Sequence, residues 1–152
     1  MRPFKFRAAA ALDLRQRDED AAATVLARKE AGFREIEAAR AAAERTREAA
    51  LADQLALSTR GIDMATLFWH RNWIVRLQGA VVDLRAEEKA AGTAVQQARE
   101  AWQAARRKRL ALERLRDRAL VRYRADEQRE ELKAIDELAR VRFTGPVMGL
   151  EN

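Results

Sequence analysis

The sequence predicts an all-α fold: a long antiparallel two-helix coiled-coil hairpin in which the second helix is longer than the first. Three observations lead to this prediction. Alanine supplies 33 of the 152 residues, and alanine buries too little apolar surface to fill a thick globular core. Charged residues make up 36% of the chain, as in long exposed helices. Proline occurs only at Pro3 and Pro146 and glycine only six times, so almost nothing interrupts helix propagation between residues 4 and 143.

The first helix is expected over about residues 4–58. Its apolar residues follow the alternating three- and four-residue steps of a heptad repeat, which predicts a helix with one packed face. Charged and polar residues share the same two columns, so tight pairing is not predicted along the whole length. The apolar members are Leu12, Ala22, Leu26, Phe33, Ile36, Ala43, Ala50 and Leu57, and the polar ones are Arg15, Glu19, Lys29, Arg40, Arg47 and Gln54.

A turn is expected over about residues 59–65. Gly61 suits the left-handed conformation that ends many helices, and either Asp63 or Thr66 could cap the helix that follows. A single short turn brings the two helices back alongside each other. We therefore predict one coiled-coil rod over residues 1–152, with a disordered tail over 144–152 for which the sequence suggests no function.

The second helix is expected over about residues 66–143. At about 1.5 Å per residue it would measure roughly 120 Å, against roughly 80 Å for the first helix. Past Tyr123 the apolar pattern changes phase to Ala125, Leu132, Ile135 and Ala139, which predicts that the helix continues without the same partner. Its seam positions are Leu77, Val81, Leu84, Ala91, Val95, Ala98, Trp102, Ala105, Leu112, Ala119 and Tyr123, interrupted by Glu88, Arg109 and Arg116.

The sequence offers no arrangement of residues for catalysis. One histidine cannot form a metal cluster, no cysteine is present, and the chain lacks the glycine-rich phosphate loop of nucleotide hydrolases. A two-helix rod also has no enclosed pocket in which carboxylates could become acids or bases. We expect no enzyme, no cofactor and no metal. The absence of cysteine and of an apolar run of roughly 20 residues favours a soluble, cytosolic protein.

Arginine and lysine are concentrated between residues 106 and 124, where nine basic residues face two acidic ones. This segment could bind an anionic partner, such as a nucleic acid, an anionic lipid or an acidic protein surface. It could equally be a solvated helix face neutralised by acids on the neighbouring helix. Nucleic acid is the less favoured partner because only Tyr123 is interleaved with the arginines. The candidate contact residues are Arg106, Arg107, Lys108 and Arg109.

Aromatic residues cluster at the start of the second helix, at Phe68, Trp69 and Trp73. From residue 73 to 84 apolar side chains fill three adjacent columns: Trp73 with Ala80, Leu77 with Leu84, and Ile74 with Val81. A two-stranded seam needs only two columns, so one is surplus. The surplus side chains either shield the turn or form a binding surface for another protein. Tryptophan is enriched where proteins meet, which favours the binding surface.

Three segments resemble the family of the flagellar export protein FliJ. They are "PFKFRAAAALDLRQRDED" at the start, "GIDMATLFWHRNWIVRLQGAV" at the turn, and "LALERLRDRALVRYRADEQREELKAIDELARVRF" near the end. Their order and spacing agree with the family over nearly the whole chain. The resemblance implies a cytoplasmic, peripheral component of the type III protein export apparatus, needed for flagellum biogenesis and motility. It also implies an antiparallel two-helix coiled coil similar to the stalk of a rotary ATPase.

The resemblance further implies two protein partners and their contact residues. One is the hexameric export ATPase, which the protein would regulate; the other is the cytoplasmic domain of the membrane export gate. Export chaperones are further candidates, and membrane contact would be only peripheral. Large tyrosines of some relatives are replaced here by Thr46 and Ala50, which shifts gate binding towards Trp73. The family's gate-binding positions fall on Trp73, Leu77, Ala80 and Leu84, and its ATPase-binding positions on Phe4 and Phe6 with Lys133, Asp136 and Glu137 opposite.

Overall fold

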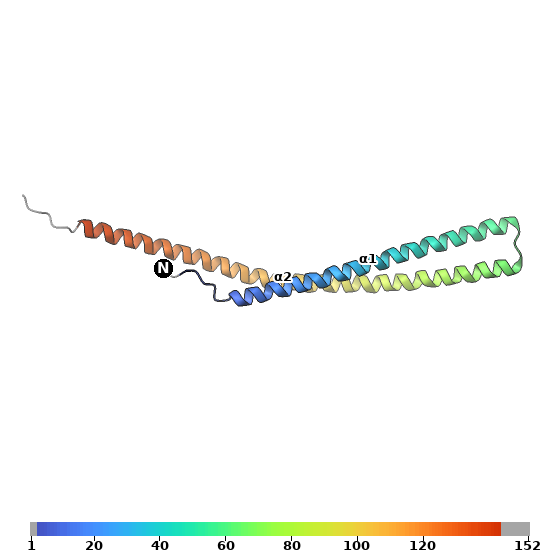
Figure 1. The fold of residues 1–152 in the computed structure, drawn as a ribbon, viewed down its shortest axis with the longest axis horizontal. Coiled ribbons are helices and arrows are strands. Elements are labelled where there is room, and N and C mark those ends of the chain that lie inside the picture. The colour runs from blue at the N-terminus through green and yellow to red at the C-terminus, as the bar shows by residue number, and fades with distance from the viewer. Residues whose placement is uncertain (1–2, 144–152) are drawn as a thin grey trace, which may run out of the picture. The chain divides into compact units, whose positions relative to one another are not determined.

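The computed structural model describes residues 3–143, which form two α-helices joined by a short turn (Figure 1). Helix α1 runs from Ala9 to Arg60 over 52 residues, and α2 runs from Met64 to Phe143 over 80 residues. The helices pack against each other in opposite directions, and residues 3–143 contain no strand. The predicted all-α hairpin with a longer second helix is therefore confirmed. The tail predicted over 144–152 lies outside the described residues.

The turn follows the predicted chemistry and decides between the two possible caps. Gly61 has φ of 78°, in the left-handed region where glycine meets no steric penalty. Asp63 is the cap, because its carboxylate accepts hydrogen bonds from the backbone nitrogen of Thr66 at 3.2 Å and from the Thr66 hydroxyl at 2.6 Å. These hydrogen bonds hold the pKa of the Asp63 carboxyl below its usual range. Helix α2 consequently begins at Met64, two residues earlier than expected.

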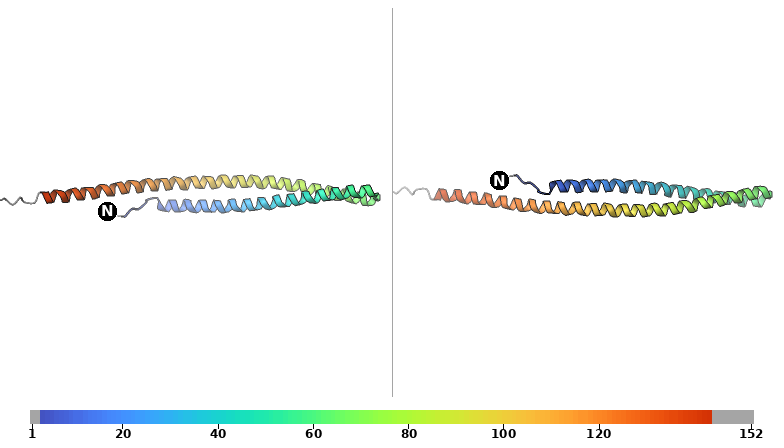
Figure 2. Two further views of the ribbon diagram at one scale, coloured as in Figure 1. Left: turned by 90° about the horizontal axis from the view of Figure 1, so that it is seen from above. Right: turned by 90° about the horizontal axis from the view of Figure 1, so that it is seen from below.

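Contacts divide the chain into two units, one of which is residues 17–106. In this unit α1 and α2 lie side by side in both views of Figure 2. Its buried side chains are few and mostly small: Ala50, Leu77, Val81 and Ala98. Most other seam positions are half-buried, as expected for two helices that cover each other along one narrow face.

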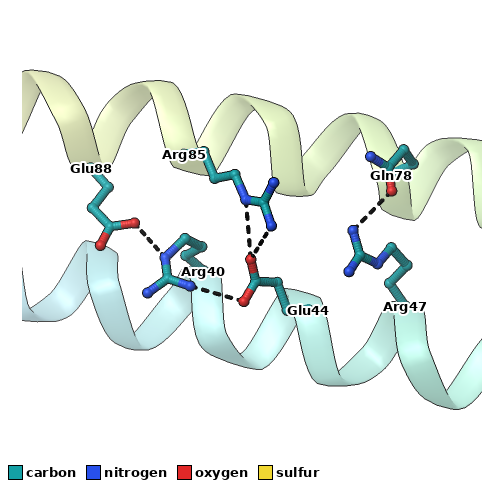
Figure 3. A network of polar contacts seen from close by, with 6 residues as sticks. All are labelled: Arg40, Glu44, Arg47, Gln78, Arg85 and Glu88. Carbon is teal, nitrogen blue, oxygen red and sulfur yellow. Dashed lines mark hydrogen bonds and ion pairs between the residues drawn. The ribbon is translucent and has the colours of Figure 1, made fainter.

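Charged residues within this seam bond to one another across the two helices (Figure 3). Arg40 of α1 forms ion pairs with Glu88 of α2 and, at 2.8 Å, with Glu44 of its own helix. Glu44 also accepts hydrogen bonds from Arg85 of α2. Arg47 donates a hydrogen bond to Gln78 at 3.0 Å. Three of the polar interruptions of the heptad pattern, Arg40, Arg47 and Glu88, thus have a polar partner on the other helix, which favours one register of the hairpin.

The second unit joins the N-terminal residues 3–16 to residues 107–143 of α2. Its first residues are not helical: α1 begins at Ala9 rather than near residue 4. Phe4 and Phe6 are half-buried, and Lys5 between them is exposed, which is the two-residue alternation of an extended segment. The ring of Phe4 lies 5.5 Å from that of Tyr123 at an angle of 59°. The segment lacks a capping residue, and burial of its two rings against α2 outweighs its helix propensity.

Helix α2 continues beyond this contact, and residues 128–143 are all exposed. The change of phase after Tyr123 correctly predicted a helix that goes on without a partner from α1. Exposed apolar side chains remain along it at Leu132, Ile135 and Leu138. Neither α1 nor α2, within the described residues, contains a stretch apolar enough to cross a lipid bilayer.

Candidate interaction surfaces

The aromatic residues near the turn lie on the surface. Phe68 and Trp69 are largely exposed, and Trp73 is 41% exposed. Trp69 and Trp73 are one helical turn apart and, with Asn72 and Arg76, line a shallow hollow of about 150 Å³. Because these rings stay open to solvent, they do not serve mainly to cover the turn. Of the two alternatives, the geometry favours a binding surface for another protein over side chains that shield the turn.

The residues predicted to bind the gate divide between the surface and the seam. Trp73 and Ala80 are exposed, whereas Leu77 is only 9% exposed and Leu84 is half-buried. Two of the three apolar columns form the helix–helix contact, and these are the columns of Leu77 with Leu84 and of Ile74 with Val81. The column of Trp73 and Ala80 is the surplus one. Leu77 and Leu84 stabilise the hairpin and offer little surface to a partner.

The residues predicted to bind the ATPase are not brought together. Phe4 contributes to a groove of about 710 Å³ whose other lining residues include Ala119, Tyr123 and Asp126 of α2. Lys133, Asp136 and Glu137 lie further along α2, on the exposed stretch. Lys133 forms an ion pair with Glu130 at 3.1 Å. The predicted set therefore comprises two separate features of this unit: the anchored N-terminal segment and the exposed end of α2.

Tyr123 connects the anchored segment to the acidic part of α2. Burial raises the pKa of its phenol, and the nearby carboxylate of Glu127 raises it further. The phenol accordingly keeps its proton and can donate a hydrogen bond to a carboxylate. Sequence reasoning placed Tyr123 in the seam but did not identify Phe4 as its neighbour.

The basic run, residues 106–124, is only partly available for an anionic partner. The guanidinium of Arg106 lies over the ring of Trp102, 5.3 Å from its centroid. Arg109 is half-buried and forms an ion pair with Glu113 at 2.7 Å. Arg107 and Lys108 are exposed. An acid of the same helix therefore neutralises Arg109, whereas the exposed pair stays open to a partner.

An apolar groove in the unit of residues 17–106 was not predicted from the sequence. Its volume is about 530 Å³. Small residues create it, because Gly32 of α1 faces Ala91 and Ala94 of α2 where larger side chains would have filled the space. The signal was present as small residues beside Phe33 and Ile36. The full lining is Val25, Arg28, Lys29, Gly32, Phe33, Ile36, Ala91 and Ala94.

The side chains suited to metal binding are dispersed. No group of three or more histidines and acids converges among residues 3–143. His70 lies half-buried in the seam beside Trp69. Four surfaces could thus carry function: the basic run, the apolar groove, the exposed end of α2 (residues 128–143), and the aromatic tip, which consists of Phe68, Trp69 and Trp73 near the turn. All of them suit contact with another macromolecule.

Comparison with known protein families identifies the family to which this chain belongs. The family model described as flagellar FliJ protein matches residues 5–146 of the 152. The chain belongs to the flagellar FliJ family. No curated protein and no solved structure matches it. FliJ proteins are components of flagellar export rather than a family of enzymes, so the role of this chain is related to export.

Thr46 and Ala50, which the sequence resemblance placed where some relatives carry tyrosine, lie on α1 of the same unit as the aromatic residues near the turn. Thr46 is exposed, and its hydroxyl donates a hydrogen bond to the backbone oxygen of Ala42 at 3.0 Å. Ala50 is buried in the seam. Neither residue offers a large side chain to a partner. Among the residues predicted to bind the gate, the large exposed side chain is therefore Trp73 of α2.

Proposed function

We propose that this chain is a stalk-like component of the flagellar type III protein export apparatus that links the export ATPase ring to the membrane export gate. The observation that carries the proposal is the FliJ family match over residues 5–146, together with a hairpin whose second helix extends beyond its partner. The protein acts in the cytoplasm, next to the inner membrane. Its mechanism is rigid contact between proteins, and export chaperones are further candidate partners.

The aromatic tip binds the cytoplasmic domain of the export gate. Trp73 is the central residue, because it combines a large exposed ring with a neighbouring hollow formed with Trp69. Ala80 lies two helical turns further along the same face and leaves room for a partner's side chain. Leu77 and Leu84 support this surface from inside the seam and act as positioning residues.

The exposed end of α2 binds the ATPase ring. Residues 128–143 present an apolar stripe flanked by charged groups, including Lys133, Asp136 and Glu137. Such a helix can insert into a groove or a central opening through residues spaced three and four apart. Phe4 stiffens the neighbouring part of α2 by packing on Tyr123.

Replacement of Trp73 tests the gate contact. Trp73→Ala should weaken binding to the purified cytoplasmic domain of the gate at least tenfold, because a large interface aromatic is often worth about 2 kcal/mol or more. Helicity by circular dichroism and stimulation of the ATPase should stay unchanged. Val75→Ala is the matched control, since Val75 is exposed on another face of α2. Equal binding by both variants, or unfolding of Trp73→Ala, would contradict the proposal.

Truncation after Glu127 tests the ATPase contact. The shortened chain should lose stimulation of the ATPase yet keep its gate affinity, because residues 128–143 make no contact that the rest of the hairpin needs. Full stimulation by the truncated chain would place the ATPase contact elsewhere.

A second candidate function is binding of an anionic macromolecule through the basic run. Exposed Arg107 and Lys108 favour it, together with Arg114, Arg118 and Arg122 at steps of seven and four residues. Residues at this spacing share one face of a helix. Ionic-strength dependence separates this candidate from the stalk.

A further inference from the structure

The apolar groove of α1 and α2 combines an unfilled hydrophobic surface with unneutralised positive charge. Gly32, Ala91 and Ala94 leave its floor open, and a Cβ built at Gly32 would meet no atom within 4 Å. The two charged residues of its lining, Arg28 and Lys29, are both basic. Neither makes an ion pair among residues 3–143. The groove therefore suits an apolar helix face that carries acidic residues at its edges.

The exposed end of α2 has the complementary character. Residues 126–139 contain six acids and only two bases. Leu132, Ile135 and Ala139 recur at steps of three and four residues, which places them on one stripe of the helix, and all three are exposed. Glu131 and Asp136 border this stripe on opposite sides at about 100° per residue. Neither carboxylate forms an ion pair within the described part of the chain.

We infer that the acidic end of α2, residues 126–139, docks in the apolar groove of a second copy of this chain. A second copy is the occupant that the charges favour, because the acids bordering the apolar stripe of this end match the bases that line the groove. Leu132, Ile135 and Ala139 would fill the space above Gly32, and Glu131 and Asp136 would meet Arg28 and Lys29. The inference uses exposure, volume and charge, and it does not depend on the proposed function.

Self-association of this kind has a consequence for the acidic end. While it occupies another molecule's groove, its apolar stripe is withdrawn from every other partner. The free protein would then hold this end in a reversible complex, which a tighter-binding partner could displace. A small contact of this size is expected to be weak, with dissociation in the micromolar range.

Charge reversal with exchange of partners tests the inference. Sedimentation velocity of the full-length protein over a concentration series should show reversible association. One variant, Arg28→Glu with Lys29→Glu, places acids in the groove, and another, Glu131→Lys with Asp136→Lys, places bases on the end of α2. Each variant alone should associate at least tenfold more weakly than the wild type. A mixture of the two should associate again, because the reversed groove of one matches the reversed end of the other.

A steric variant tests the apolar part of the contact. Gly32→Leu should block docking without strain, because Gly32 has open space and no positive φ. Gly79→Leu is the matched control, since Gly79 is also helical with no atom within 4 Å of a Cβ, and it lies outside the groove. A wild-type protein that stays monomeric, association that survives Gly32→Leu, or a variant mixture that fails to associate would each overturn the inference.

Discussion

Glu44 of α1 accepts two hydrogen bonds from Arg85 of α2, at 3.1 Å from Nε and 2.7 Å from Nη2. Its other carboxylate oxygen accepts a hydrogen bond from Arg40 at 2.8 Å. Arg85 first, and Arg40 after it, hold the pKa of the Glu44 carboxyl below its usual range. The same network raises the pKa of Arg40, chiefly through Glu88. The carboxylate of Glu44 thus binds Arg40 of α1 and Arg85 of α2 at the same time.

This relationship predicts a pH-dependent contribution to stability. The pKa of Glu44 is lower in the folded chain than in the unfolded chain, so the ionised form favours folding. Its contribution is complete at neutral pH and declines once the pH falls below about 4.5, towards the lowered folded pKa. Glu44→Gln should therefore melt at a lower temperature than the wild type at pH 7, and the difference should shrink at pH 3. Glu48→Gln is the control, because Glu48 is exposed and makes no ion pair in the described chain.

Replacement by alanine should have very different effects on stability at two adjacent valines. Val81 is 0% exposed and Val82 is 54% exposed. Val81→Ala should lower the free energy of unfolding by roughly 1–3 kcal/mol through the cavity that it leaves in the seam. Val82→Ala should change that free energy by at most about 0.5 kcal/mol. Urea titration followed by circular dichroism measures both, and equal losses would show that the seam lies elsewhere.

Glycine substitutions distinguish the turn from the helix. Gly61→Ala should destabilise the hairpin by roughly 1–2 kcal/mol, because a residue with a Cβ is strained at φ of 78°. Gly79→Ala should instead stabilise it by roughly 0.5–1 kcal/mol, since alanine is the better helix former and space is free at this site. Thermal melts give the two shifts. A stabilising Gly61→Ala would contradict the observed turn.

The N-terminal segment should become accessible when its aromatic contact is removed. Phe4→Ala loses a ring pair worth about 0.5–1.5 kcal/mol, so trypsin should cut after Lys5 and Arg7 several times faster than in the wild type. Phe143→Ala, at an exposed phenylalanine, should leave this rate unchanged. Mass spectrometry of the early fragments identifies the cut sites.

The dependence of binding affinity on salt concentration should show which class of partner the basic run binds. If it binds nucleic acid, affinity for a single-stranded oligonucleotide should fall steeply between low and physiological salt, because neutralised phosphates release counterions. Arg107→Ala with Lys108→Ala should reduce that slope. The stalk function predicts weak binding that disappears at physiological salt, and persistent submicromolar binding there would favour the second candidate.

Local interactions made much of this structure predictable. Helices α1 and α2 follow from uninterrupted helix formers and heptad spacing, because helical hydrogen bonds and i, i+3 and i, i+4 contacts depend on nearby residues. The turn also follows locally, since only glycine adopts φ of 78° at Gly61 without strain. The surplus aromatic column was visible for the same reason: counting columns needs only the periodicity of one helix.

Tertiary structure decided what depends on the partner helix. It showed that Leu77 packs in the seam while Trp73 stays outside, which the column count alone could not assign. It showed Phe4 extended against Tyr123 where propensity predicted helix. It also showed that Gly32 faces Ala91 and Ala94, so a groove remains. Each of these depends on the register between α1 and α2, and register is set by contacts between residues that are distant along the chain.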